Sequence, residues 1–131
     1  MSQSFVILFH VHVESKNNHL DLLVELQPGG ALASWRLMAA PEALEQVPSE
    51  HEPEGLPAEQ QPDHRREFLT YEGPVSGGRG DVRRVDHGCV TLVDRSPGHV
   101  TFTLAGQRLR GTFTLRHVEG GRWELRRATT V

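Results

Sequence analysis

The chain has 131 residues, of which 37% are hydrophobic and 24% charged, a composition that fits one globular domain and excludes a disordered chain. Its single cysteine, Cys89, excludes an internal disulfide and a cysteine-rich zinc site. The longest apolar run, residues 5–9, is too short to span a membrane or to act as a secretion signal, so we expect a cytoplasmic protein.

The net charge of −3 conceals an uneven distribution along the chain. Residues 1–63 carry ten acidic and two basic residues, whereas residues 64–131 carry twelve arginines and seven acids. Thirteen of the fourteen basic residues are arginine, whose guanidinium group suits two-pronged contacts to phosphate or carboxylate. The overall acidity argues against a protein that coats duplex DNA through its electric field. A local phosphate site and ordinary solvated arginines remain two open interpretations.

The first half of the chain alternates apolar and polar residues with the period of β-strands. Strands are expected over residues 4–13, 19–26 and 31–37, and a short helical turn over residues 41–46. In the second of these strands the even-numbered residues face one side and the odd-numbered residues the other. Residues 47–63 hold four prolines among many acids and no apolar period, which predicts a long acidic loop.

The second half contains only strand signals, separated by turns rich in glycine, proline and serine. The expected strands cover residues 66–72, 81–86, 88–94, 99–105, 107–117 and 122–128. Eight or nine short strands with almost no helix indicate an all-β, mainly antiparallel fold. We expect a single domain over residues 1–131: a small closed or partly open β-barrel of about eight strands, with one short helix and the long acidic loop. A β-sandwich is the alternative.

Histidines gather on the first two expected strands. His10 and His12 are two residues apart on one strand, and His19 and Asp21 are two apart on the next, so each pair shares a face. Two or three imidazoles with one carboxylate suit Mn²⁺, Zn²⁺ or Fe²⁺. If the strands pair directly, we expect Asp21 opposite His10 or His12, because a slip of one residue would separate the pairs. The alternative is a solvated strand face without a metal.

Four segments occur in a fixed order: FVILFH, HLDLLVEL, GGALASWRL and DHRREFLTYEGPVSGGRGDV. Together they resemble the 3′-phosphoesterase domain of bacterial DNA ligase D and its short stand-alone relatives, over residues 5–86. The resemblance implies a compact β-barrel that binds Mn²⁺, or alternatively Zn²⁺, and trims the 3′ ends of DNA or RNA. It implies His10, His19 and Asp21 as metal ligands, with His12 as a further candidate. It also implies that His64 contacts the phosphate or assists the leaving group, and we expect His64 to share a cavity with the metal ligands.

The sequence departs from the family pattern at four polar positions, which are here Leu23, Phe68, Pro62 and Val11. Leu23 stands where the family has an arginine, and Phe68 where it has a tyrosine. Among the arginines that could substitute, Arg36 and Arg65 are the first choices, ahead of Arg66 and Arg79. On this reasoning, Leu23→Arg with Phe68→Tyr is expected to restore the phosphate-binding residues.

Two functions stay open. The first is a metal-dependent phosphoesterase that removes a 3′-phosphate or a terminal 3′-ribonucleotide, in DNA end repair, and it is favoured by the retained histidines and aspartate. The second is a non-catalytic barrel that recognises phosphorylated nucleic-acid ends or a partner protein, and it is favoured by the four departures. The expected partners are nucleic-acid 3′ ends and DNA repair ligase or end-joining proteins, with no membrane contact, and the chain is expected to be a monomer.

Overall fold

The computed structural model describes residues 2–128; residues 1 and 129–131 of the expected single domain lie outside the described part. The strands of the described part are β1 (Gln3–Val11), β2 (His19–Val24), β3 (Leu32–Leu37), β4 (Leu56–His64), β5 (Gly73–Pro74), β6 (Asp81–Ser96), β7 (His99–Ala105), β8 (Arg110–Glu119) and β9 (Arg122–Arg127). Three short 3₁₀ helices connect them: η1 (Ser15–Asn17), η2 (Pro41–Gln46) and η3 (Arg66–Leu69). None of the helices described is long and apolar enough to cross a membrane.

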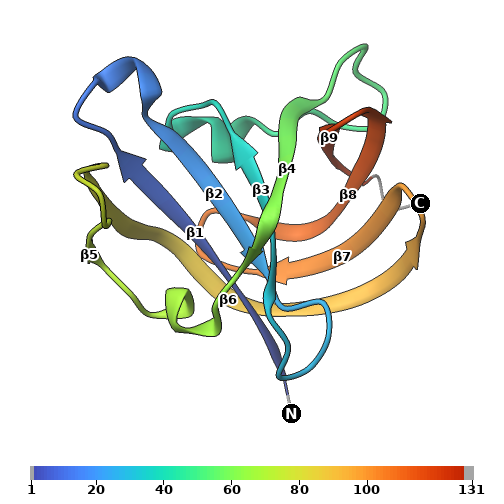
Figure 1. Ribbon diagram of the computed structural model, residues 1–131. Coiled ribbons are helices and arrows are strands. Elements are labelled where there is room, and N and C mark those ends of the chain that lie inside the picture. Colours follow the sequence, from blue (N-terminus) through green and yellow to red (C-terminus); the bar gives the residue numbers. More distant parts are fainter. Residues whose placement is uncertain (1, 129–131) are drawn as a thin grey trace.

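Eight of these strands close into an antiparallel barrel (Figure 1). Their order around the barrel is β1, β2, β3, β4, β9, β8, β7 and β6, and the pairing of β6 with β1 closes the circle. The two-residue strand β5 pairs with the beginning of β6. The expected all-β barrel is thus confirmed, in its closed form, and the expected helical turn at residues 41–46 is η2.

The period-2 alternation of β1, β2 and β3 sends every second side chain into the barrel. The main apolar core includes the following residues of these strands: Phe5, Ile7, Leu20, Leu22, Val24, Trp35 and Leu37. Burying one such side chain stabilises the fold by about 1.5–3 kcal/mol.

A second apolar cluster lies on the outer face of the barrel wall. We call it the outer cluster; its buried members are Val6, Leu8, Leu23, Leu32 and Val82. Phe68, Leu69 and Val75, from the segment that runs from η3 to β5, pack against it. This segment covers part of the wall, so outward-facing residues of β1 and β2 are buried as well as inward-facing ones.

The prediction of a long loop over residues 47–63 was wrong in its second half, where β4 lies. Its residues 56–59 pair with β9 and its residues 59–64 with β3, so each half leaves one side unpaired along most of its length. Proline lacks an N–H and is tolerated in a strand at such unpaired sides and at bulges. Pro57 lies in the first half, and Pro62 lies at the register shift of the second.

Two further strand predictions need correction. Residues 66–72 were expected to form a strand, but they contain η3, whose apolar residues cover the outer cluster. The strands expected at residues 81–86 and 88–94 are one continuous strand, β6. Gly88 marks the point where β6 passes from β1 to β7: a Cβ there would lie 2.1 Å from the carbonyl oxygen of Ala105. The glycine therefore permits close strand contact rather than ending the strand.

Candidate metal centre

The antiparallel pairing of β1 and β2 brings His10, His19 and Asp21 together on the outer face of the barrel. His10 lies opposite His19, and Asp21 lies opposite Leu8 rather than opposite a histidine as expected. Because Leu8 and His10 are two residues apart on β1, their partners Asp21 and His19 lie on the same face of the barrel wall as His10. One ligand atom from each of the three residues lies within 4.8 Å of the others, and all three residues are more than nine-tenths buried. These residues could hold a metal ion.

The orientation of His19 supports a cation at this place. Its Nδ1 donates a hydrogen bond to the carbonyl of Asn17 at 2.9 Å, so the Nε2 of a neutral ring carries a lone pair. That Nε2 lies 3.2 Å from Oδ2 of Asp21, a carboxylate oxygen that also offers lone pairs. The contact is favourable only with positive charge on or between the two atoms, either a proton on the ring or a metal ion. A carbonyl that fixes the tautomer of a ligating histidine is typical of metal sites.

The ring of His10 is held in a similar way. Its Nε2 donates to the carbonyl of Arg79 at 2.6 Å, which leaves Nδ1 as the ring nitrogen with a free lone pair. Burial lowers the pKa of His10, and the nearby His19 lowers it further, although the Arg79 carbonyl acts in the opposite direction. A lowered pKa keeps the ring neutral at pH 7, and the neutral imidazole is the form that binds metals.

Asp21 has an oxygen atom that lacks a partner within the described protein. Its Oδ1 is buried and accepts no hydrogen bond, and the nearest cation, Nε of Arg36, is 3.8 Å away. That separation is too long for a hydrogen bond, and leaving such a buried acceptor unpaired costs about 1–3 kcal/mol. The donor set of two neutral imidazoles and one unsatisfied carboxylate therefore fits a divalent ion, which would satisfy all three.

His12, the further candidate ligand, lies just beyond the end of β1. Its ring centroid is 5.7 Å from that of His10, and its Nδ1 accepts a hydrogen bond from the backbone N–H of Glu14 at 3.3 Å. The convergent group of ligand atoms consists of His10, His19 and Asp21 and does not include His12.

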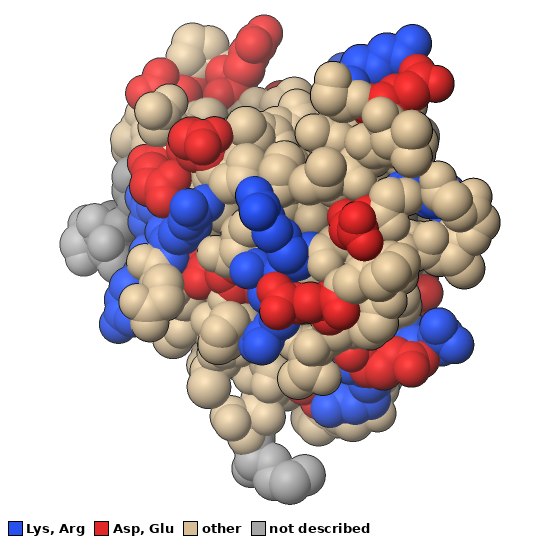
Figure 2. All heavy atoms as spheres, turned by 90° about the vertical axis from the view of Figure 1, so that its left-hand side faces the viewer, with Lys and Arg blue, Asp and Glu red and all other residues tan. Residues whose placement is uncertain are grey.

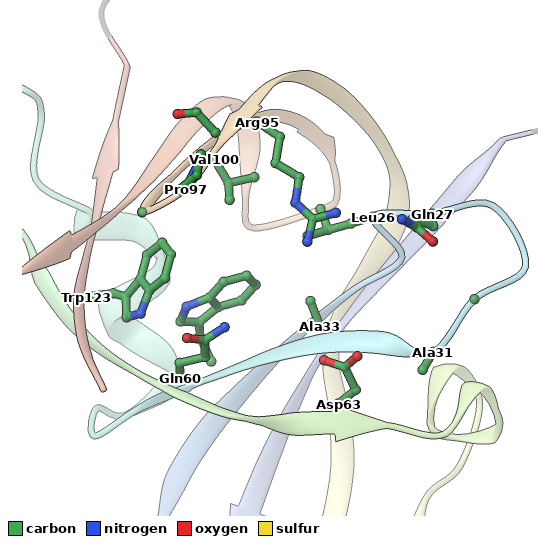
Figure 3. A pocket seen from close by; sticks show the side chains of 14 residues that line it. Leu26, Gln27, Ala31, Ala33, Gln60, Asp63, Arg95, Pro97, Val100 and Trp123 are labelled. Atoms are coloured by element: carbon green, nitrogen blue, oxygen red, sulfur yellow. The ribbon is translucent and has the colours of Figure 1, made fainter. Parts of the chain in front are cut away.

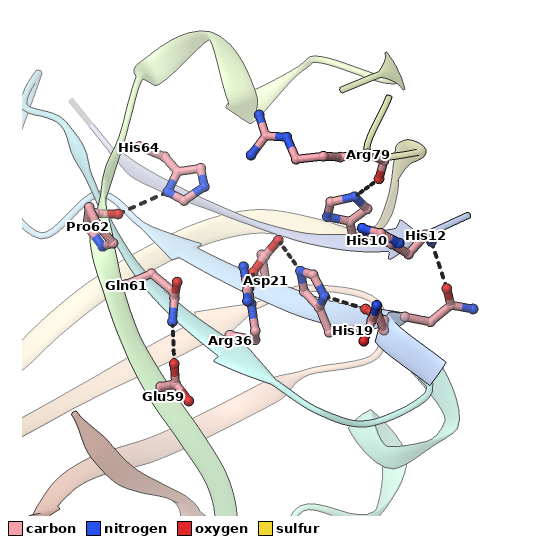
Figure 4. Close-up of polar contacts among 12 residues, drawn as sticks. His10, His12, His19, Asp21, Arg36, Glu59, Gln61, Pro62, His64 and Arg79 are labelled. Carbon is pink, nitrogen blue, oxygen red and sulfur yellow. Dashed lines mark hydrogen bonds and ion pairs between the residues drawn. The ribbon is translucent and has the colours of Figure 1, made fainter. Parts of the chain in front are cut away.

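A cavity of about 620 Å³ opens beside these residues. We call it the outer cavity; its lining includes His10, Asp21, Arg36, His64, Arg65, Phe68, Tyr71 and Arg79. Figure 4 shows the His64 side chain extending from β4 into this space, on the other side from His10. The Nδ1 of His64 lies 3.1 Å from the carbonyl of Pro62, to which it can donate, so Nε2 is left for a ligand. His64 thus lines the same cavity as His10 and Asp21.

The arginines that sequence analysis favoured differ in their surroundings. Arg36, the cross-strand neighbour of Asp21, lines the outer cavity and faces that carboxylate. Arg65 lies at the rim, where its side chain is 78% exposed and its Nε is 2.8 Å from Glu67. Arg79, ranked behind both from the sequence, also lines the cavity.

One lining residue was missed from the sequence. Tyr71 lies near the position where Phe68 replaces the tyrosine of the family, and its ring contacts that of Phe68 edge to face. Its hydroxyl donates to the carbonyl of Pro74, so it is already engaged as a donor. In the sequence, the one sign that Tyr71 lines the cavity is its position three residues after Phe68.

The structure revises the expected effect of restoring an arginine at position 23. Leu23 is fully buried in the outer cluster, beneath Phe68 and Leu69. A guanidinium there would lie among apolar side chains, so Leu23→Arg is no simple restoration of a phosphate-binding group.

A second cavity, of about 690 Å³, lies at one end of the barrel (Figure 3). Its lining combines Trp35, Trp123 and Val100 with Asp63 and Arg95, and it contains none of the three metal-ligating residues. Asp63 lines both cavities. The candidate residues His10, Asp21 and His64 therefore line the outer cavity and not this one.

Charge on the molecular surface is mixed. On the face drawn in Figure 2, basic and acidic side chains are interspersed and neither sign dominates. On this face no field of a single sign would attract an anionic ligand, so such attraction would depend on individual guanidinium groups.

Comparison with known protein families matches residues 10–117 to the DNA ligase D 3′-phosphoesterase domain. The match includes all three metal-ligating residues and His64. A search of curated proteins found no match.

Proposed function

The chain belongs to the DNA ligase D 3′-phosphoesterase domain family, and from this premise we propose that it is a divalent-metal-dependent phosphoesterase acting on the 3′ ends of DNA or RNA. The reaction would remove a 3′-phosphate or a terminal 3′-ribonucleotide. Mn²⁺ is the ion that we propose, with Zn²⁺ as the alternative, because a mixed set of imidazoles and one carboxylate suits both.

The observation that carries this proposal is the buried convergence of His10, His19 and Asp21 at the wall of the outer cavity. Backbone carbonyls fix both imidazoles so that lone pairs remain for a ligand. This degree of orientation would serve no purpose on a solvated strand face, where histidines need no fixed tautomer.

The residues around the cavity would have different roles in the proposed reaction. A divalent ion at the three ligands would supply Lewis acidity toward a phosphoryl oxygen. Because Nδ1 of His64 donates to the Pro62 carbonyl, Nε2 would donate a hydrogen bond to the phosphate, or a proton to the departing oxygen, in the doubly protonated form of the ring. Arg36 would hold Asp21 in place and face the phosphate with its remaining N–H groups. Arg65, at the rim, would contact the nucleic-acid backbone outside the cavity.

A second function is favoured by one observation. Leu23 and Phe68 fill the outer cluster with apolar groups where the family resemblance implies an arginine and a tyrosine. A barrel that binds a metal and a phosphorylated end without cleaving it would need fewer polar groups. We therefore keep a non-catalytic module that recognises phosphorylated ends or a partner protein as the second candidate.

An end-trimming assay distinguishes the two. Primers ending in a 3′-phosphate or a 3′-ribonucleotide are incubated with the protein in Mn²⁺, in Zn²⁺ and after chelation. We expect Mn²⁺-dependent release of phosphate by the wild type. In a His19→Ala, Asp21→Ala variant the rate of release should fall by more than roughly 100-fold, because removing even a residue that only supports a ligand costs roughly 10- to 100-fold. His51→Ala, which changes an exposed histidine in the loop between β3 and β4, serves as the matched control. Tight binding of phosphorylated primers without turnover would favour the second function.

The proposed setting is DNA end repair in the cytoplasm, with DNA repair ligase or end-joining proteins as partners and the chain acting as a monomer. The family match, which is to a domain of a DNA ligase, supports this setting.

A further inference from the structure

Arg79 lies in the turn between β5 and β6, and Figure 4 shows its guanidinium extending over the outer cavity toward the side of His64. We propose that Arg79 binds the phosphoryl group of the ligand in this cavity and thereby favours a terminal phosphate over an internal phosphodiester. This inference rests on the proposed function and assigns to Arg79 a role that position 23 cannot fill.

The charge of Arg79 has no acidic partner among the described residues. Arg36 faces the carboxylate of Asp21 at 3.8 Å, and Arg65 forms an ion pair with Glu67 at 2.8 Å. Within residues 2–128, no carboxylate lies within 4.0 Å of the Arg79 guanidinium. An arginine that is already neutralised gains less from an anionic ligand than one that is not. Of the three cavity arginines, Arg79 is therefore the one without a carboxylate within 4.0 Å among the described residues.

The guanidinium of Arg79 is held in position before a ligand arrives. Nε of Arg79 donates to the carbonyl of Ser76 at 2.8 Å, and Nη2 donates to the Ser76 hydroxyl at 3.3 Å. These bonds leave both N–H groups of Nη1 and one of Nη2 for a ligand. Gly80 brings the turn close to β1, since a Cβ there would lie 2.1 Å from the carbonyl oxygen of Val11. The turn is thus packed tightly against the barrel, which reduces the entropy lost on binding.

The main chain of Arg79 also contacts the candidate metal site. The Arg79 carbonyl accepts the hydrogen bond from Nε2 of His10, so the turn that supplies the cation also orients a metal ligand. A phosphoryl oxygen near the metal-ligating group would then lie within the cavity that Arg79 lines. Any substitution of the side chain keeps this carbonyl, which makes the two roles separable by mutation.

The free charge has a consequence for specificity. A terminal phosphate near pH 7 carries close to two negative charges, whereas an internal phosphodiester carries one. Coulomb energy scales with the product of the charges, so one unpaired guanidinium stabilises the terminal phosphate more. Loss of the Arg79 side chain should thus reduce the preference for a terminal phosphate as well as the affinity for it.

The test compares Arg79→Ala with the wild type by stopped-flow fluorescence anisotropy in Mn²⁺, over times shorter than one turnover, so that the 3′-phosphate stays intact. The probes are an oligonucleotide with a 3′-phosphate and the same oligonucleotide with a 3′-hydroxyl. We expect the Kd for the 3′-phosphate probe to rise about ten- to a hundredfold, with a much smaller change for the 3′-hydroxyl probe. Calorimetry should show unchanged affinity for Mn²⁺, because the carbonyl remains. Arg116→Ala, which removes an exposed arginine from β8, should leave all three affinities unchanged.

The outcomes separate this inference from the proposed function. If the wild type neither binds nor hydrolyses the 3′-phosphate probe, the proposed function itself fails. If the wild type binds it and Arg79→Ala binds it equally well, the assignment of Arg79 is wrong while the function stands. Loss of Mn²⁺ affinity in both Arg79→Ala and Arg79→Gln would show that the side chain acts by shaping the turn, and it would also overturn the inference.

Discussion

Glu25, just beyond the end of β2, is a buried carboxylate outside the metal-ligating group. Its Oε1 accepts the backbone N–H of Ser4 at 2.9 Å, and its Oε2 accepts the N–H of Gly29 at 2.7 Å and Nη1 of Arg66 at 2.9 Å. Burial alone would raise the pKa of Glu25, but these donors outweigh it and hold the pKa below its usual value of 4.5. The charged form therefore stabilises the fold.

We expect Glu25→Gln to lower the free energy of unfolding by about 2–3 kcal/mol at pH 7, since hydrogen bonds to a charged group are lost. Because the pKa is lower in the folded state, the folded protein binds fewer protons than the unfolded one in acid. The stabilisation by the charged Glu25 is complete above the pKa of the unfolded state, about 4.5, and it is lost as the pH falls through the lower pKa of the folded state. Urea unfolding at neutral pH and below pH 4.5 checks this. A stability difference that does not shrink in acid would contradict it; Glu42→Gln, at an exposed carboxylate, is the control.

At the scale of single elements, the outer cluster gives β1 and β2 their burial on both faces. Leu23 contributes to it with no exposed surface, and the residues of η3 cover it. His10 and Asp21, which lie on the same outward face of β1 and β2, are buried as well. Apolar packing and the metal-ligating group are thus adjacent parts of one buried face.

This arrangement predicts the effect of an arginine at position 23. We expect Leu23→Arg to lower the free energy of unfolding by about 3–5 kcal/mol, because an unpaired charge would be buried. Leu23→Met, which conserves volume, should cost less than about 1.5 kcal/mol. Denaturant unfolding of the two variants measures the difference. If Leu23→Arg were as stable as the wild type and trimmed 3′ ends faster, the side chain would reach the outer cavity and the packing argument would be wrong.

The strands that sequence reasoning located best are those with clear alternation. In β2, the alternation correctly separated inward residues such as Leu20 and Leu22 from outward ones such as Asp21 and Leu23. It failed for β4, because Pro57, Pro62 and many acids conceal a strand that is unpaired along part of each side. It also failed for η3, because local alternation carries no information about whether a partner strand is available.

The same limit applies to the site. The convergence of His10, His19 and Asp21 could be predicted because these residues are close in sequence and lie on neighbouring antiparallel strands. Arg79 could not be ranked, because its place over the cavity depends on a turn packed against β1. The buried Asp86 was not singled out at all: it accepts backbone N–H groups of Gln107 and Leu109, far along the chain, and so fixes the turn between β7 and β8.

At the scale of the whole molecule, the proposed metal connects two strands that the barrel already pairs. An ion bound only by the folded state adds its binding free energy to the stability of the entire fold. The ligand atoms are oriented by backbone carbonyls of the chain, so the site exists in the folded protein and is lost when β1 and β2 separate.

We therefore expect Mn²⁺ at 100 times its Kd to raise the free energy of unfolding by about 2.7 kcal/mol, equivalent to a rise in Tm of roughly 8–12 °C for a domain of this size. Mg²⁺ should have little effect, because it prefers oxygen ligands to imidazole. A His19→Gln, Asp21→Asn variant should have the same Tm with and without Mn²⁺, because the imidazole and the carboxylate that would bind the ion are both removed. Thermal unfolding followed by circular dichroism, before and after chelation, measures each case. An equal rise in Tm for the variant would place the ion elsewhere on the molecule. No rise in the wild type at saturating Mn²⁺ would mean that a proton, and not a metal ion, lies between His19 and Asp21.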